Sequence, residues 1–243
     1  DEDTMVVSIQ AANNEIGTIQ PIKKLAALAH ATGAYFHTDA AQAVGKISVD
    51  VLEWEVDLLS ISAHKIYGPK GVGALFVRGG AYSMPISPLV YGGEQEYNLR
   101  SGTLNAPGIV GFGKACELCS QELESEMERL SSLRDFLESQ LIKQLEVQRN
   151  GSLNNRLPNN CSFTFRGIDA EALIVNMPEL AISTGSACTS GALEPSSVLQ
   201  AIGLSREDAD STIRIGIGRL TTEDEIVTAS KLIVATLKKL KEY

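Results

Sequence analysis

One lysine stands in the part of this sequence that is richest in chemically useful side chains. An apolar run of β type at residues 58–62 leads into Ser62-Ala63-His64-Lys65, and a glycine-punctuated turn leads to a second β-type run at residues 74–77. A lysine at the end of a buried strand is costly unless its amine is solvated, paired or covalently used. Lys65 is therefore either an ordinary surface lysine or an amine that forms a Schiff base with a carbonyl compound such as pyridoxal phosphate (PLP).

Polar residues that follow other predicted strands could complete a site of that kind. Asn14, Asp39 and Gln42 all fall just past strand ends, which is where ligands bind in open parallel sheets. Pyridoxal chemistry needs a carboxylate that keeps the pyridine nitrogen protonated, and Asp39 suits this role, although a lone Asp after a strand also serves as a helix cap. Gln42 could reach the pyridoxal hydroxyl, and Ser62 and His64 could bind the phosphate.

Two further candidates lie in the second half of the chain. Cys188 lies in a loop of small and hydroxylated residues, a setting that favours a reactive thiolate over a buried structural thiol. Arg214 lies within the β-type run 212–217, where its guanidinium could grip a substrate carboxylate or form a structural ion pair.

The other cysteines do not indicate a metal site. Cys116 and Cys119 have the spacing of half a zinc or redox site, but they lie in a predicted helix without a second Cys/His pair, so we expect no metal. Four cysteines in 243 residues make no disulfide framework and favour a reducing compartment.

The order of predicted elements indicates an α/β fold with a mainly parallel sheet, followed by a smaller α+β domain. Strands and helices alternate, with strands at 5–9, 35–37, 58–62, 74–77, 161–165, 181–183 and 212–217, and helices at 21–32, 107–145, 169–176, 195–202 and 222–240. The last helix begins with the capping box Thr222-x-x-Glu225.

A long predicted helix marks the change of domain. Leucines and Met127 recur along residues 107–145 at spacings of three and four, while the glutamates at 122, 124, 126 and 128 indicate a solvated face. We therefore expect one domain at residues 1–106 and a second, which carries the Cys188 loop, at residues 107–243.

Composition excludes several classes of protein. The net charge is −9 and the pI is about 4.9, which argues against a general nucleic-acid or anionic-membrane binder. No signal-peptide pattern is visible in these 243 residues, and no apolar run approaches the roughly 18 residues that span a bilayer.

Six segments together resemble the cysteine desulfurases of the NifS/IscS type, in the class V aminotransferase group of fold-type I PLP enzymes. In chain order they are 12–17 (Ala-Asn-Asn-Glu-Ile-Gly), 37–46, 60–73, 100–103 (Arg-Ser-Gly-Thr), 183–196 and 213–219. The resemblance runs over almost the whole chain, and it implies the aspartate aminotransferase-like fold for the PLP-binding domain. The Cys188 loop, followed by Leu-Glu-Pro-Ser, is close to diagnostic for one branch of that group.

The resemblance implies a role for each candidate residue. Lys65 would hold PLP and shuttle the substrate α-proton, Arg214 would bind the substrate carboxylate, and Cys188 would accept the sulfur. The remaining cofactor contacts would come from residues that touch the ring, its hydroxyl or its phosphate: Asn14, Asp39, Gln42, Ser62, His64 and, across a dimer interface, Thr103. Asn14 would also contact the substrate, and His64 would count with Lys65 and Cys188 among the catalytic residues.

The same resemblance implies a reaction and its partners. L-cysteine would be converted to L-alanine, and the sulfur would remain on Cys188 as a persulfide. A homodimer would pass it to a sulfur-acceptor protein, such as an iron–sulfur scaffold, or toward tRNA thiolation. The expected location is the cytoplasm, or an organelle in a eukaryote, with no direct contact to nucleic acid or membrane.

Two alternatives stay open on the sequence alone. One is a sister pyridoxal enzyme, such as a selenocysteine lyase. The other is an inactive binding or dimerisation module, because the family's phosphate-binding turn and ring-stacking histidine have no counterpart in these 243 residues. We expect that they lie upstream of Asp1 in a longer protein and that this chain by itself binds PLP weakly.

Overall fold

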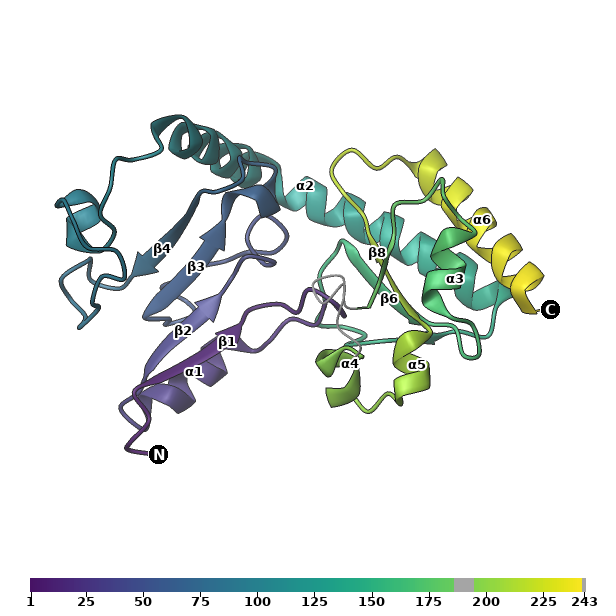
Figure 1. The fold of residues 1–243 in the computed structure, drawn as a ribbon, viewed down its shortest axis with the longest axis horizontal. Coiled ribbons are helices and arrows are strands. Elements are labelled where there is room, and N and C mark those ends of the chain that lie inside the picture. The colour runs from purple at the N-terminus through teal and green to yellow at the C-terminus, as the bar shows by residue number, and fades with distance from the viewer. Residues whose placement is uncertain (186–194, 242–243) are drawn as a thin grey trace. The chain divides into compact units, whose positions relative to one another are not determined.

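The computed structural model describes residues 1–185 and 195–241. They divide into two compact units, one made of residues 1–12 and 20–123 and the other of residues 13–19 and 124–243. The change of unit falls inside helix α2 (Ala106–Gln144), whereas the sequence predicts a domain boundary at residues 106/107. Figure 1 shows the order of the elements along the chain.

The first unit is built on a mixed sheet with strand order β1-β2-β3-β4. Its strands are β1 (Val6–Gln10), β2 (Tyr35–Asp39), β3 (Leu58–Ser62) and β4 (Gly73–Val77). Strands β1, β2 and β3 are parallel, whereas β4 pairs with β3 in the antiparallel sense. The turn between β3 and β4 is too short for the crossover that a parallel pair requires, so the prediction of a mainly parallel sheet holds with one antiparallel edge.

Helical segments complete the first unit. Helix α1 (Ile22–His30) contacts β1 and β2 through an apolar face, and its Ala26 is fully buried. The short 3₁₀ turns are η1 (Ala63–Ile66) and η2 (Gln95–Asn98). The sheet face that carries Phe36 and Leu59 is buried, whereas the face that carries Ser8 and Asp39 is more exposed.

The second unit is an antiparallel sheet with strand order β5-β6-β8-β7. Its strands are β5 (Gln148–Arg149), β6 (Asn160–Thr164), β7 (Ser183–Thr184) and β8 (Thr212–Gly216). Its helices, besides the second part of α2, are α3 (Ala170–Val175), α4 (Ser197–Ala201), α5 (Arg206–Asp210) and α6 (Glu223–Lys241).

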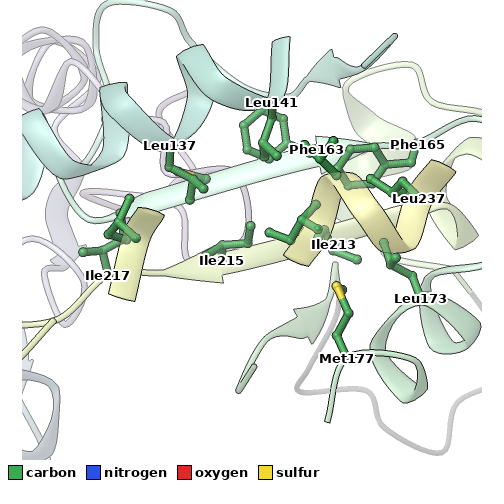
Figure 2. Close-up of a cluster of buried hydrophobic side chains, with 14 of the residues drawn as sticks. Leu137, Leu141, Phe163, Phe165, Leu173, Met177, Ile213, Ile215, Ile217 and Leu237 are labelled. Atoms are coloured by element: carbon green, nitrogen blue, oxygen red, sulfur yellow. The ribbon is translucent and has the colours of Figure 1, made fainter. Parts of the chain in front are cut away.

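The core of the second unit is one cluster of buried apolar side chains. Figure 2 shows its buried side chains gathered around strands β6 and β8, with contributions from α2, α3 and α6. Leu137 and Leu141 come from the predicted apolar stripe of α2, and Phe163 and Ile213 come from the paired strands. All four are fully buried, so each contributes about 1.5–3 kcal/mol of apolar burial.

Helix α6 follows its sequence pattern at its first turn, whereas helix α2 departs from its pattern at one glutamate. The capping box at the start of α6 is confirmed, because the Thr222 N–H donates to Glu225 Oε2 at 2.8 Å and the Glu225 N–H donates to Thr222 Oγ1 at 3.2 Å. The solvated glutamate face of α2 is wrong at Glu126, which is buried and receives hydrogen bonds from the Arg219 guanidinium at 2.8–3.3 Å. A buried carboxylate is tolerated because that cation neutralises it.

Candidate active site

The first unit places its chemically useful side chains at one edge of its sheet. Because β2 and β3 are parallel, Asp39 at the end of β2 and Ser62 at the end of β3 lie at the same carboxyl edge, and Asp39 is in register with Ser60. Gln42 lies in the turn that follows β2, and η1 follows β3 directly. The register places the β2 and β3 ends at one edge, whereas Asn14, which the sequence analysis grouped with them, belongs to the second unit, and the predicted roles of these residues stay predictions.

The 3₁₀ turn η1 presents His64 and Lys65 to solvent, and both side chains are exposed. Ser62 Oγ and His64 Nδ1 form a hydrogen bond of 2.8 Å, so the two expected phosphate ligands act as one pair. The turn ends at Tyr67 in the left-handed conformation (φ 65°). Gly68 then packs so closely that an added Cβ would lie 2.9 Å from the Ala63 carbonyl oxygen. The exposure of Lys65 removes the cost that burial would impose on its amine.

Asp39 is oriented by its own turn. Its Oδ1 accepts a hydrogen bond of 2.9 Å from the backbone N–H of Ala41. A turn and not a helix follows β2, so the helix cap that the sequence offered as an alternative role is not formed. The carboxylate is otherwise exposed at the sheet edge. This turn contact and a role toward a ligand are compatible, because a carboxylate has two oxygens and several lone pairs.

A histidine that the sequence analysis assigned to no role lies beside this carboxylate. His37 Nδ1 is 2.7 Å from Ser8 Oγ, and His37 Nε2 is 3.1 Å from Ser60 Oγ. Burial lowers the pKa of His37, and the negative charge of Asp39 opposes that shift only in part. The alternation of strand side chains, which puts residues 37 and 39 on one face, is the signal that could have identified it.

Thr103 lies in the exposed segment before α2. Its backbone carbonyl is 3.5 Å from the Arg100 guanidinium, which also donates to the Gly102 carbonyl at 3.0 Å. These local contacts fix the backbone of the Arg-Ser-Gly-Thr segment. The role of Thr103 toward a phosphate across a dimer stays a prediction.

The second unit holds Arg214 in a half-buried position on β8. Its Nη1 donates to the Asn14 backbone oxygen at 2.8 Å, and its Nε and Nη2 donate to Ser183 Oγ at 3.3 and 3.2 Å. In the described ranges its partners are thus neutral oxygens and include no carboxylate. The structural ion pair considered for Arg214 is therefore not formed within the described ranges, and the role of its guanidinium toward a substrate carboxylate stays a prediction.

The loop that carries Asn14 is shaped by its own sequence. Asn13 Oδ1 accepts hydrogen bonds from the N–H groups of Glu15 and Ile16 at 2.8 and 3.0 Å, a turn that Asn forms readily. Gly17 adopts φ 70° and packs on Asn160, so a residue without a side chain is required there. The backbone carbonyl of Asn14 consequently points to Arg214, a contact that sequence reasoning did not foresee.

Glu15 contacts Ser196, which follows the segment that contains Cys188. The Ser196 hydroxyl donates to Glu15 Oε2 at 2.5 Å and also caps α4, since Ser196 Oγ accepts from the Leu199 N–H. Cys188 itself lies outside the described residues. Its predicted role therefore stays a prediction.

The remaining cysteines fit structural roles. Cys119 is buried in a small apolar cluster with Ile66 and Phe112, and burial raises the pKa of the neighbouring Cys116 thiol. Cys161 is also buried, and its pKa is raised strongly for the same reason. In residues 1–185 and 195–241, no group of three or more His, Cys, Asp or Glu side chains is arranged to hold a metal ion.

A family model for class V aminotransferases matches residues 1–228 of the chain. The chain is 49% identical over 240 residues to a mitochondrial cysteine desulfurase of Arthroderma benhamiae, covering 99% of this chain and 48% of that protein. It is 46% identical over 242 residues to the cysteine desulfurase IscS of Ehrlichia chaffeensis, covering 99% of this chain and 59% of that protein. The chain thus spans about half to three fifths of the length of these relatives.

Solved structures agree with these sequence matches. A NifS-like protein superposes with a TM-score of 0.88 at 38% identity, covering 98% of this chain and 62% of that chain. A protein described as SspA in complex with cysteine superposes with a TM-score of 0.71 at 38% identity, covering 88% of this chain and 59% of that chain. The predicted resemblance and fold class are confirmed.

Proposed function

Because the chain belongs to the class V aminotransferase family, we propose that it carries the reactive groups of a PLP-dependent cysteine desulfurase that converts L-cysteine to L-alanine. The observation that carries the proposal is the exposed Lys65 amine, placed directly after β3 next to the parallel strand end that bears Asp39. The relatives named as cysteine desulfurases, at 46–49% identity, support it.

The chemistry of the donor set fits PLP. An amine, a carboxylate and a hydroxyl–imidazole pair lie at one sheet edge, and these match the aldehyde, the pyridine nitrogen and the phosphate. Lys65 would hold the aldehyde carbon, Asp39 the ring nitrogen, Gln42 the ring hydroxyl, and Ser62 with His64 the phosphate. Two further contacts, from Asn14 and Thr103, are proposed on the family resemblance. When bound, the cofactor supplies an electron sink for the substrate carbanion.

Three side chains of the protein would carry out the remaining steps of the reaction. The Arg214 guanidinium binds the substrate carboxylate, and the Lys65 Nζ takes the α-proton and delivers a proton later. The Cys188 thiolate attacks the substrate sulfur, so that an S–S bond forms and the substrate carbon–sulfur bond breaks. The electron pair of the broken bond stays on the substrate carbon, which is protonated to give alanine, and Cys188 keeps the sulfur as a persulfide.

The partners and location are proposed on the same basis. The chain would act as a homodimer, with Thr103 directed to the second copy, and would pass its sulfur to an acceptor protein such as an iron–sulfur scaffold. A reducing compartment, either the cytoplasm or an organelle, suits a free thiolate. In the described part of the chain, no helix has the length and apolar character needed to cross a bilayer.

Borohydride reduction tests the cofactor assignment directly. The chain is incubated with PLP, reduced and digested, and the labelled peptide is mapped by mass spectrometry. We expect a pyridoxyl group on Lys65, its loss in Lys65→Ala, and its retention in Lys70→Ala, a matched change at an exposed lysine of the same turn. A label spread over several lysines, or none at Lys65, contradicts the assignment.

A cysteine substitution tests the sulfur acceptor. Cys188→Ser should keep the bound-cofactor absorbance of the parent chain and release no sulfide from cysteine, whereas Cys116→Ser should leave sulfide release unchanged. Sulfide release by Cys188→Ser at the rate of the parent chain would remove Cys188 from its proposed role.

A further inference from the structure

His37 connects three neighbouring strands through its side chain. Its Nδ1 is 2.7 Å from Ser8 Oγ on β1 and its Nε2 is 3.1 Å from Ser60 Oγ on β3. Ser8 is in register with His37, and Ser60 is in register with Asp39. Both ring nitrogens are therefore engaged, and the plane of the imidazole is fixed on the sheet face that bears Asp39.

This arrangement accommodates a neutral imidazole. A neutral ring has one nitrogen that donates and one that accepts, and a serine hydroxyl can take either complementary role. Burial lowers the pKa of His37 although the Asp39 carboxylate acts in the opposite direction. The result is an uncharged ring two residues from an exposed carboxylate.

Few other ionisable groups face this ring. On the face that His37 shares with its neighbours, the strand residues of β1, β3 and β4 are not ionisable, and β2 adds the ionisable side chains of Tyr35 and Asp39. His64 binds Ser62 at the end of β3. Helix α1 contacts β1 and β2, and the residues of the opposite sheet face, Phe36 and Leu59, are buried. Among the described strand residues of this face, Asp39 is the carboxylate that meets the ring.

We propose that His37 is a positioning residue for Asp39: Ser8 and Ser60 hold its ring neutral, so that the carboxylate keeps its whole negative charge for a bound pyridine nitrogen. A protonated His37 would compete with that nitrogen for Asp39, because two cations near one carboxylate share its attraction and repel each other. The proposal rests on the proposed function, in which Asp39 faces the cofactor ring. It adds His37, which would not contact the cofactor itself, to the residues that support cofactor binding. It also predicts that protonation of the His37 ring at low pH weakens the binding of the cofactor.

The test compares a neutral and a permanently charged replacement in the whole chain. PLP binding is followed by absorbance and fluorescence between pH 5.5 and 8.5, a range chosen to surround the ordinary histidine pKa of about 6.5. The parent chain should bind PLP less tightly as the pH falls through the His37 titration. His37→Gln should keep the affinity seen at pH 8 within about threefold and lose this pH dependence, whereas His37→Lys should bind at least about tenfold more weakly at every pH.

A second readout does not depend on the cofactor. In the cofactor-free chain, the His37 ring is titrated by NMR, and Ser8→Ala should move its pKa upward toward the ordinary value, because loss of the exposed hydroxyl opens Nδ1 to water. Thermal unfolding of each variant verifies that it is folded. Ser8→Ala keeps the test available if a His37 variant fails to fold.

The outcomes separate this proposal from the one on which it rests. If Lys65 is labelled by borohydride while His37→Lys binds PLP as the parent chain does, the positioning role is overturned and the proposed function stands. If Ser8→Ala leaves the His37 titration unchanged, the role of the serines is overturned. If Lys65 is not labelled at all, both proposals fail together.

Discussion

Two groups of charged side chains, one in each compact unit of this chain, lie in opposite surroundings. The first unit leaves Asp39, His64 and Lys65 exposed at a sheet edge, where each is held by a turn or a short local hydrogen bond. In the second unit Glu138 is buried and paired with Arg156 at 2.6 Å and with Arg149 at 2.7 Å. A charged side chain that stabilises a fold is neutralised by an oppositely charged partner. A charged side chain that binds a ligand must lack such a partner within the protein.

The largest expected effect tests whether the second unit depends on its apolar core. Phe163→Ala removes a ring that is fully buried on β6, and we expect the free energy of unfolding to fall by about 4 kcal/mol. Phe136→Ala is the matched control, because that ring is 41% exposed on α2. Denaturant unfolding of both variants checks the expectation. Equal losses in the two variants would contradict the packing in Figure 2.

The next effect tests whether the buried charges of the second unit stabilise it as pairs. The side chains of Glu138 and Arg156 are only 4% and 6% exposed. Glu138→Gln leaves two arginines without their carboxylate, and we expect a loss of about 3 kcal/mol in thermal or denaturant unfolding. Asp135→Asn, at a carboxylate that is 61% exposed, should change stability by less than about 1 kcal/mol.

A smaller effect is expected at the capping box of α6. Thr222→Ala removes the hydroxyl that accepts from the Glu225 N–H, and it should lower the free energy of unfolding by about 1 kcal/mol. Thr222→Ser keeps a capping hydroxyl and serves as the control. A loss in Thr222→Ser as large as that in Thr222→Ala would show that the methyl group, and not the cap, is responsible.

The smallest effect at neutral pH comes from His37 in the first unit. Because its pKa is lowered in the folded chain, the unfolded state binds more protons when the pH falls below the ordinary histidine range. The free energy of unfolding should therefore fall with decreasing pH through that range, whereas near pH 8 the ring is neutral in both states. Unfolding curves between pH 5 and 8 should be flatter for His37→Gln. An unchanged slope would contradict the burial of the ring.

Local sequence patterns were sufficient for much of the fold. The strand at residues 58–62 is predicted with the bounds it has in the structure, and α2 begins and ends within one residue of its predicted range. The two-residue strand β5 and the short helix α5 were not predicted, and β7 was predicted at residues 181–183 but lies at Ser183–Thr184, because segments of two to five residues show no clear periodicity. The antiparallel edge β4 is set by a short connection that the strand pattern alone does not reveal.

The candidate site was predictable where it depends on motifs and not where it depends on distant contacts. Asp39, Ser62 and Lys65 follow strand ends in the sequence and share one sheet edge in the structure. The serine partners of His37 lie 29 and 23 residues away, and the Arg219 partner of Glu126 lies 93 residues away. Such pairings need the strand register or the tertiary fold, which spacing along the chain does not contain.

The Asn14 loop has a consequence for how the chain folds. Residues 13–19 belong to the second unit although the chain on both sides of them belongs to the first, and the contact from Asn14 to Arg214 spans 200 residues. Contacts of such large sequence separation form slowly, because the entropy of closing the loop is lost before the contact stabilises it. During synthesis this contact must also wait until β8 has left the ribosome. Arg214 therefore reaches its final surroundings late, and nascent chains that end before residue 214 lack this contact.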